Sequence, residues 1–192
     1  PHVIAYKATH SRSTSVQEFY EASWKKKVME TKEEFVKIQN EISEEMGELA
    51  RAMASGNIVG CADVSGSMTY CGTSPNTPLD IAVGLTAFIS CIASDNFKNV
   101  ALSFTDVPQV FSFAEGTSVR NRINQITSRV GYSTNYEGLH KALLELCVKN
   151  KVPENELPVL WVGTDGEFNT MDYNVGTTTW ETIHESITKM WY

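Results

Sequence analysis

The chain has 192 residues, of which 42% are hydrophobic and 20% are charged. This is the composition of an ordinary globular domain and excludes a disordered or fibrous chain. The formal net charge is −7, and an acidic surface is poorly suited to nucleic-acid phosphates, so we expect no direct nucleic-acid binding. The most apolar stretch, residues 81–93, is too short to cross a bilayer, so we expect no membrane contact.

The four cysteines are scattered along the chain, and none shows the CxxC spacing of a zinc site. They are Cys61, Cys71, Cys91 and Cys147. We expect four free, reduced thiols, which are typical of intracellular proteins. No signal peptide is apparent at the N-terminus. We therefore expect an intracellular, cytoplasmic location.

The N-terminal part of the chain predicts a helical extension over residues 1–56. Residues 1–13 show only a short apolar piece and a serine-rich loop. From residue 14 to residue 54, apolar side chains recur at steps of three and four between Lys and Glu, which predicts an amphipathic helix. These side chains include Phe35, Ile38, Ile42, Met46, Leu49 and Met53. We expect this helix to pack on the domain or on a neighbour.

Residues 57–192 predict one domain in which strands and helices alternate. The predicted strands cover residues 57–62, 100–104, 110–113 and 158–164. The predicted helices cover residues 77–94, 118–127, 135–150 and 180–192. The first of these helices has a clear start signal, because Thr77 supplies a cap, Pro78 follows, and Asp80 stands three residues after the cap.

This order of elements predicts an α/β fold with an open, mostly parallel, doubly wound (Rossmann-like) sheet and helices on both faces. Residues 110–113 follow the preceding strand after a short connection, which predicts a hairpin and one antiparallel edge strand. In such sheets ligands bind beyond the carboxyl ends of the strands. The residues that follow the parallel strands are therefore the candidates for a functional site.

The first candidate segment is Asp63-x-Ser65-x-Ser67, which directly follows an apolar strand. Alternate residues of an extended segment point the same way, so the carboxylate and the two hydroxyls can face one point. Oxygen ligands without His or Cys suit Mg²⁺, Mn²⁺ or Ca²⁺. This segment predicts a site for a hard divalent cation.

Two further segments offer oxygen ligands at element ends. Thr134 stands at the start of a predicted helix, and Asp165 ends a predicted apolar strand and is followed by Gly166. Taken singly, each of these residues has a simpler role as a cap or a turn residue. Their combination at three element ends favours a metal site.

Residues 57–170 resemble the von Willebrand factor type A (VWA) family, whose metal-ion-dependent adhesion site combines DxSxS, threonine and aspartate loops. Asp63-Val-Ser-Gly-Ser-Met, Thr134-Asn-Tyr-Glu and Asp165-Gly-Glu-Phe look closest to an uncharacterised intracellular branch of VWA-like proteins. The resemblance implies direct metal contacts from Ser65 and Ser67, contact from Thr134 directly or through water, and mostly water-mediated contacts from Asp63 and Asp165. VWA domains usually have further strands after the point where this chain stops, which leaves open whether the domain is complete.

The expected function is metal-dependent protein recognition. Neutral hydroxyl ligands leave the cation poorly compensated, so a partner's Asp or Glu can fill an open coordination position. Two alternatives stay open: a structural part of a larger assembly (ribonucleoprotein, viral or cellular) with a non-essential metal site, and a metal-dependent hydrolase with Glu167 as base. We expect no enzyme, since Ser65 lacks the Gly-x-Ser-x-Gly elbow and the chain has no phosphate-binding Gly-Lys-Ser/Thr loop.

Overall fold

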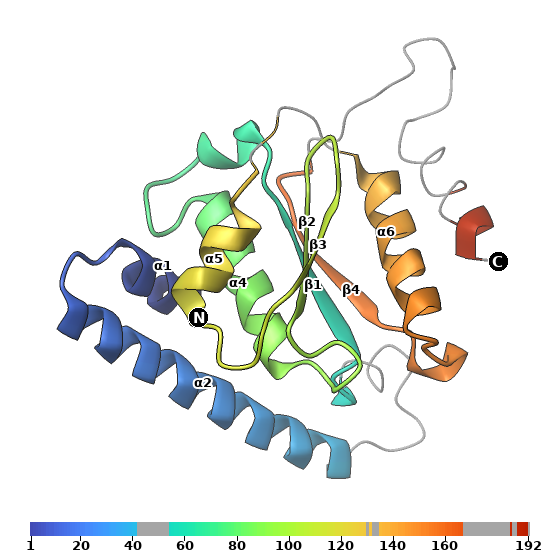
Figure 1. The fold of residues 1–192 in the computed structure, drawn as a ribbon, viewed down its shortest axis with the longest axis horizontal. Helices are drawn as coiled ribbons and strands as arrows, with labels where there is room; N and C mark the ends of the chain where they lie inside the picture. Colours follow the sequence, from blue (N-terminus) through green and yellow to red (C-terminus); the bar gives the residue numbers. More distant parts are fainter. Residues whose placement is uncertain (42–53, 130, 132–134, 167–184, 186–187, 192) are drawn as a thin grey trace.

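The computed structural model describes residues 1–41, 54–129, 131, 135–166, 185 and 188–191. At its centre lies a four-stranded sheet with the strand order β3-β2-β1-β4 (Figure 1). The strands are β1 (Ile58–Asp63), β2 (Val100–Phe104), β3 (Gln109–Ser112) and β4 (Val159–Gly163). β1 is parallel to β2 and β4, and β3 is antiparallel to β2 at one edge. The predicted fold class is confirmed, including the antiparallel edge strand.

Helices cover both faces of the sheet, as the alternating pattern predicted. In Figure 1 the helices α1, α2, α4 and α5 lie to the left of the sheet and α6 lies to its right. Their bounds are α1 His2–His10, α2 Thr14–Glu41, α4 Pro78–Ile92, α5 Val119–Ile126 and α6 Tyr136–Lys149. The side chains of β1 alternate between the two layers: Ala62 belongs to the left-hand cluster, and Val59 and Cys61 belong to the cluster with α6.

Helix α4 is the central helix of the left-hand layer and starts where its sequence signal placed it. The Thr77 hydroxyl accepts the backbone N–H of Asp80 at 3.1 Å and donates to the Asp80 carboxylate at 2.8 Å. Nine of its residues are buried, among them Thr86 and Phe88. The helix passes so close over β1 that a Cβ atom added at Gly60 would lie only 2.9 Å from Cα of Thr86.

The N-terminal helices pack on the same core as the sheet. Helix α1, which the sequence did not predict, buries Ala5 and Ala8 in the cluster that contains Ala62. A nine-residue helix is marginal alone, so packing on α4 stabilises it. This contact needs Gly84, since a side-chain carbon there would lie 2.6 Å from Cα of His2. The predicted boundary at residue 56 itself stays a prediction.

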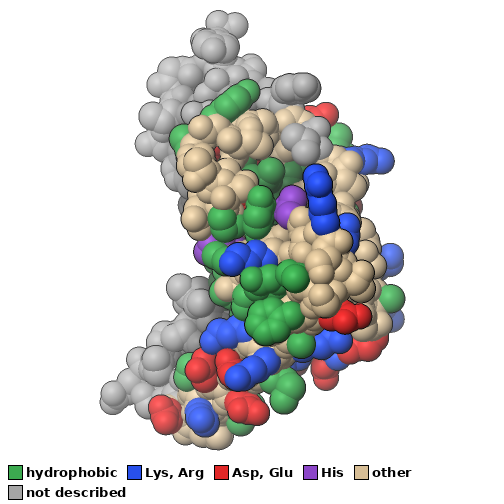
Figure 2. All heavy atoms as spheres, turned by 90° about the vertical axis from the view of Figure 1, so that its left-hand side faces the viewer, with side chains coloured by type: hydrophobic (Ala, Val, Ile, Leu, Met, Phe, Trp, Pro, Cys, Tyr) green, Lys and Arg blue, Asp and Glu red, His purple; other side chains and the backbone are tan. Residues whose placement is uncertain are grey.

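Helix α2 packs on the core at two points, but the predicted apolar stripe is only partly covered: Trp24 is buried, whereas Ile38 is 45% exposed. Trp24 meets Phe88 of α4 edge to face at 5.4 Å, and the Glu21 carboxylate accepts the N–H of Val119 at the start of α5. Its other side carries interspersed Lys and Glu in the lower part of Figure 2, including the pair Lys26–Glu30 at 3.8 Å. The helix was predicted to run to residue 54. The structure describes it to Glu41, and residues 42–53 lie outside the described part.

The C-terminal helix predicted over residues 180–192 falls mostly outside the described residues. Residues 188–191 are helical, and Trp191 packs against the cluster next to α6. All four cysteines are free thiols: Cys61 and Cys147 are buried, Cys91 is half-buried and Cys71 is exposed. None of the helices in the described part of the chain is long and apolar enough to span a membrane.

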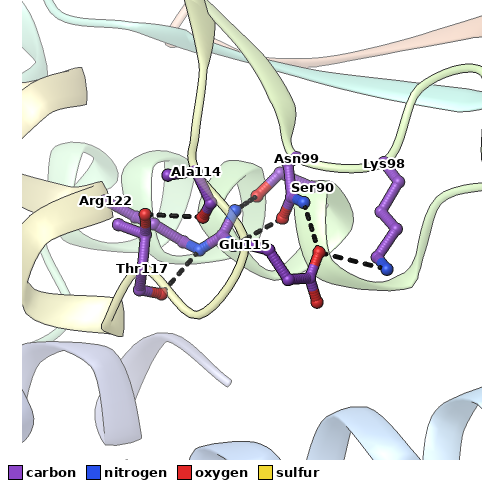
Figure 3. Close-up of polar contacts among 7 residues, drawn as sticks. All are labelled: Ser90, Lys98, Asn99, Ala114, Glu115, Thr117 and Arg122. Atoms are coloured by element: carbon purple, nitrogen blue, oxygen red, sulfur yellow. Dashed lines mark hydrogen bonds and ion pairs between the residues drawn. The ribbon is translucent and has the colours of Figure 1, made fainter.

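A buried arginine joins α5 to α4 and to the start of β2 (Figure 3). Arg122 is 4% exposed, and its guanidinium donates to the Ser90 hydroxyl at 3.0 Å, the Asn99 side-chain oxygen at 2.6 Å and the Thr117 carbonyl at 3.2 Å. It also lies over the Phe113 ring at 4.7 Å. One side chain on α5 therefore forms hydrogen bonds with three segments: α4, the residue before β2 and the loop before α5.

Candidate cation site

The Asp63 carboxylate is the centre of the candidate site. It lies at the end of β1, at the upper edge of the sheet in Figure 1, and is fully buried. One carboxylate oxygen accepts the Ser65 N–H at 2.9 Å, and the other accepts the Thr164 hydroxyl at 2.8 Å. Within the described ranges no Lys, Arg or His forms an ion pair with it. A buried carboxylate without a cation is unusual, because buried charges are normally paired or bind metal.

The two predicted serine ligands lie in the turn directly after Asp63. Ser65 is 3% exposed. Ser67 is the second residue of the short 3₁₀ helix η1 (Gly66–Thr69). Their hydroxyl oxygens face each other at 3.1 Å. The structure therefore brings Asp63, Ser65 and Ser67 into one turn, but Ser67 lies in a 3₁₀ helix and not in an extended segment, so the tight turn, and not strand alternation, brings its hydroxyl to that of Ser65.

The third predicted segment reaches the same point through β4. Ala62 pairs with Gly163 in the sheet. The next residues therefore lie side by side: Asp63 is the last residue of β1, and Thr164 directly follows β4. Asp165 follows and is exposed. The Thr164 hydroxyl, which donates to Asp63, also accepts the Gly166 N–H at 3.1 Å. Sequence reasoning missed Thr164, although its place between a strand and Asp165 was a usable signal.

The loop before α6 is held against the turn that contains the serines. Gly131 forms a parallel bridge with Ser65, and its carbonyl accepts the Gly66 N–H at 3.1 Å. Only glycine fits there, because a side-chain carbon would lie 2.6 Å from Cβ of Thr105. Thr134, the predicted ligand of this loop, lies outside the described residues.

Helix α6 begins at Tyr136, and Asn135 is its N-cap. The Asn135 side-chain oxygen accepts the Gly138 N–H at 2.8 Å, and its backbone N–H donates to the Thr105 carbonyl at 2.7 Å. The cap thus ties the start of α6 to the end of β2. Gly131 and Asn135, the described residues on either side of positions 132–134, are both held by backbone hydrogen bonds.

A further carboxylate at this edge, Asp106, was not predicted from the sequence. It follows β2 and accepts the Thr105 hydroxyl at 2.7 Å, and this hydrogen bond is the main reason why the pKa of Asp106 is lowered. The Asp106 carboxylate lies close to the Gly131 backbone, since a Cβ atom added at Gly131 would be only 2.9 Å from Asp106 Oδ1. The usable signal was the same as for Asp63 and Asp165, namely an aspartate just after a predicted parallel strand.

The nearest histidine along α6 does not neutralise these carboxylates. His140 packs against the Tyr136 ring at 5.0 Å, and burial lowers its pKa, so the imidazole is neutral at pH 7. Its Nε2 is buried and has no hydrogen-bond partner in the part of the chain that the structure describes. Burial, and secondarily Asp63, also raises the pKa of Cys61, so this thiol stays protonated.

The donor set fits a hard cation better than a soft one. Among the described residues no three His, Cys, Asp or Glu side chains cluster as metal ligands. The facing hydroxyls of Ser65 and Ser67 beside the buried Asp63 carboxylate are oxygen donors with little negative charge. Such donors suit Mg²⁺, Mn²⁺ or Ca²⁺.

The structure is an open α/β fold with oxygen-bearing side chains beyond the carboxyl ends of its parallel strands. Residues 57–192 match the family described as "Domain of unknown function (DUF7788)", and the chain belongs to this family. No curated protein matches the chain. No solved structure matches it either.

The resemblance to the VWA family is wrong as a family assignment, because the family found for this chain is DUF7788. The physical reason is that the resemblance was carried by short segments. Aspartates and hydroxyl residues after parallel strands occur in many open α/β proteins, and shared strand-end chemistry does not define a family. Any function of the site must be argued from this chain's own geometry.

Proposed function

We propose that this protein is a divalent-cation-dependent protein-interaction module whose partner supplies an Asp or Glu. In this proposal Ser65, Ser67 and Thr134 bind the cation, with Asp63 and Asp165 behind them. The bound Mg²⁺, or Mn²⁺ or Ca²⁺, supplies a positive charge that a partner carboxylate can compensate. The observation that carries the proposal is the fully buried Asp63 carboxylate, which has no cationic partner among the described residues and lies beside two facing hydroxyls.

The chain's own residues prepare the site in two ways. The Asp63 carboxylate accepts a hydrogen bond at each oxygen, so its orientation is fixed before any ligand arrives. The donors beside it are hydroxyls, which do not neutralise a divalent charge. Net positive charge is thus left for a partner. Fixed outer groups of this kind increase the affinity of metal sites.

The first test is direct metal binding. We expect wild-type protein to bind Mg²⁺ or Mn²⁺ in a calorimetric titration and the Ser65→Ala/Ser67→Ala double variant to lose about 100-fold or more in affinity, since even outer-shell changes lose 10–100-fold. Ser13→Ala/Ser15→Ala is the matched control, because these exposed hydroxyls also face each other, at 2.9 Å. Equal binding by the two double variants would rule out the ligand assignment.

The second test separates capture of a carboxylate from a purely structural cation. Changing Ser67 to Asp adds an anionic ligand, so we expect equal or tighter Mn²⁺ binding and weaker binding of an added carboxylate. Acetate is the probe, and displacement of water from bound Mn²⁺, followed by proton relaxation, is the measurement. If metal affinity and acetate binding both increase in this variant, carboxylate capture is wrong.

The competing functions give different results in the same samples. A structural component of a larger assembly would keep its partner after EDTA treatment. A metal-dependent hydrolase would turn over a substrate only with metal present. The proposed module needs the cation for partner binding and shows no turnover.

A further inference from the structure

We infer that Thr164 is a positioning residue of the proposed cation site: its hydroxyl holds Asp63 and shapes the turn that carries Asp165. The inference rests on the proposed function, and it adds a residue that does not itself bind the cation. It also links the end of β1 to the turn after β4 through one side chain.

The hydroxyl of Thr164 has two hydrogen-bond partners. Its proton goes to the Asp63 carboxylate at 2.8 Å, and its oxygen accepts the Gly166 N–H at 3.1 Å. A hydroxyl has a single proton to donate, so this donor cannot serve a second acceptor while it holds Asp63. The strand register places it there, since Ala62 pairs with Gly163 one residue earlier.

For Asp63, Thr164 supplies one of two donors that come from different elements. The other donor is the Ser65 N–H in the turn after β1, at 2.9 Å. Because Asp63 is fully buried, water cannot replace a lost donor. Without the Thr164 hydroxyl, one carboxylate oxygen would be free to rotate away from its present direction.

For Asp165, Thr164 sets the backbone on the N-terminal side of a tight turn. The bond from the Gly166 N–H to the Thr164 side chain is the type that hydroxyl residues form in short turns. Gly166 has a φ of +81°, a conformation that favours glycine. Asp165 lies between these two constraints, so the same hydroxyl that orients Asp63 also fixes the turn around Asp165.

Thr164→Val tests the inference, because valine keeps the shape and removes both hydrogen bonds. We expect its Mg²⁺ and Mn²⁺ affinities to fall about 10–100-fold, as for other outer-shell groups, and the metal-free unfolding midpoint to fall by about 2–8 °C. Thr164→Ser keeps the hydroxyl and should restore the affinity to within about threefold of wild type.

Thr86→Val is the matched control. Thr86 is fully buried, whereas Thr164 is half-buried; it lies on α4, and its hydroxyl has no hydrogen-bond partner among the described residues. We expect this variant to bind metal like wild type and to unfold at the same temperature or a higher one. If Thr164→Val does not fold, Thr164→Cys replaces it, since a thiol is a weaker donor. Its affinity should then lie clearly below that of Thr164→Ser.

The outcomes separate the inference from the proposed function. If wild-type protein binds neither Mg²⁺ nor Mn²⁺, the proposed function fails, and the inference fails with it. If wild-type protein binds and Thr164→Val binds equally well, the inference alone is overturned, even if the variant is less stable. Equal affinities of Thr164→Cys and Thr164→Ser would overturn it in the same way.

Discussion

Replacing Arg122 by Met is expected to lower the free energy of unfolding by about 3–5 kcal/mol, because three hydrogen bonds from a charged donor, each worth about 1.5–3 kcal/mol, are lost and water replaces them only in part. Methionine keeps much of the apolar stem but none of the donors. The Asn99 side-chain oxygen and the Thr117 carbonyl, which belong to half-buried residues, would each lose the bond that Arg122 gives them. The packing of the guanidinium over the Phe113 ring would be lost as well.

The loss should be large because Arg122 holds three acceptors at once, in addition to the backbone bond from the Asn99 N–H to the Ser90 carbonyl at 2.7 Å. It joins α5 to Ser90 on α4 and to Asn99, which has a φ of +62° and precedes β2. Asn99 in turn donates to Glu115 at 3.0 Å, and Lys98 pairs with the same carboxylate at 3.2 Å (Figure 3). The hydrogen bond from Asn99 is the first reason why the pKa of Glu115 is lowered.

Urea unfolding monitored by circular dichroism measures this effect. Arg120→Met is the control on the same helix, because Arg120 is exposed and should change stability by no more than about 0.5 kcal/mol. Arg122→Lys should recover only part of the loss, since an ammonium cannot reach three acceptors as a planar guanidinium does. Similar stabilities for Arg122→Met and Arg120→Met would show that the network is not needed.

The second large effect is expected at Asp63. At a Mg²⁺ concentration about 100 times the Kd, binding should stabilise wild-type protein by about 2.7 kcal/mol. Asp63→Asn should lose this gain, because an amide has nearly the same shape but no charge to balance a divalent cation. The Ser65 N–H can still donate to the remaining oxygen, so the metal-free variant should fold.

Thermal unfolding of both proteins, with Mg²⁺ and with EDTA, measures this difference. Asp95→Asn serves as the control, because it removes the same charge from an exposed position away from the sheet edge. It should respond to Mg²⁺ as wild type does. The proposed site is wrong if Mg²⁺ stabilises Asp63→Asn as much as the wild type.

The local sequence was sufficient for most of the elements. The four strands could be predicted because short apolar runs between turn residues have few other folded conformations. The start of α4 could be predicted because Thr77, Pro78 and Asp80 form a capping pattern that acts within one turn. The turn with Asp63, Ser65 and Ser67 could be placed for the same reason: it depends on one strand and the five residues around its end.

The family to which the chain belongs could not be predicted from such local patterns. A motif of five residues describes the chemistry at one strand end and contains no information about the rest of the fold. The segments around Asp63 and Asp165 are therefore compatible with many open α/β proteins, and the match over residues 57–192 is to DUF7788.

Contacts between distant residues were decided only by the tertiary structure. Helix α1 forms because Ala5 and Ala8 pack on α4, where Gly84 leaves room for the backbone. Thr164 lies 101 residues after Asp63 in the chain, and only the pairing of β4 with β1 makes them neighbours. Local sequence patterns reflect the conformations of a few adjacent residues, whereas these contacts depend on which strands pair and which helices pack, and the whole chain decides that.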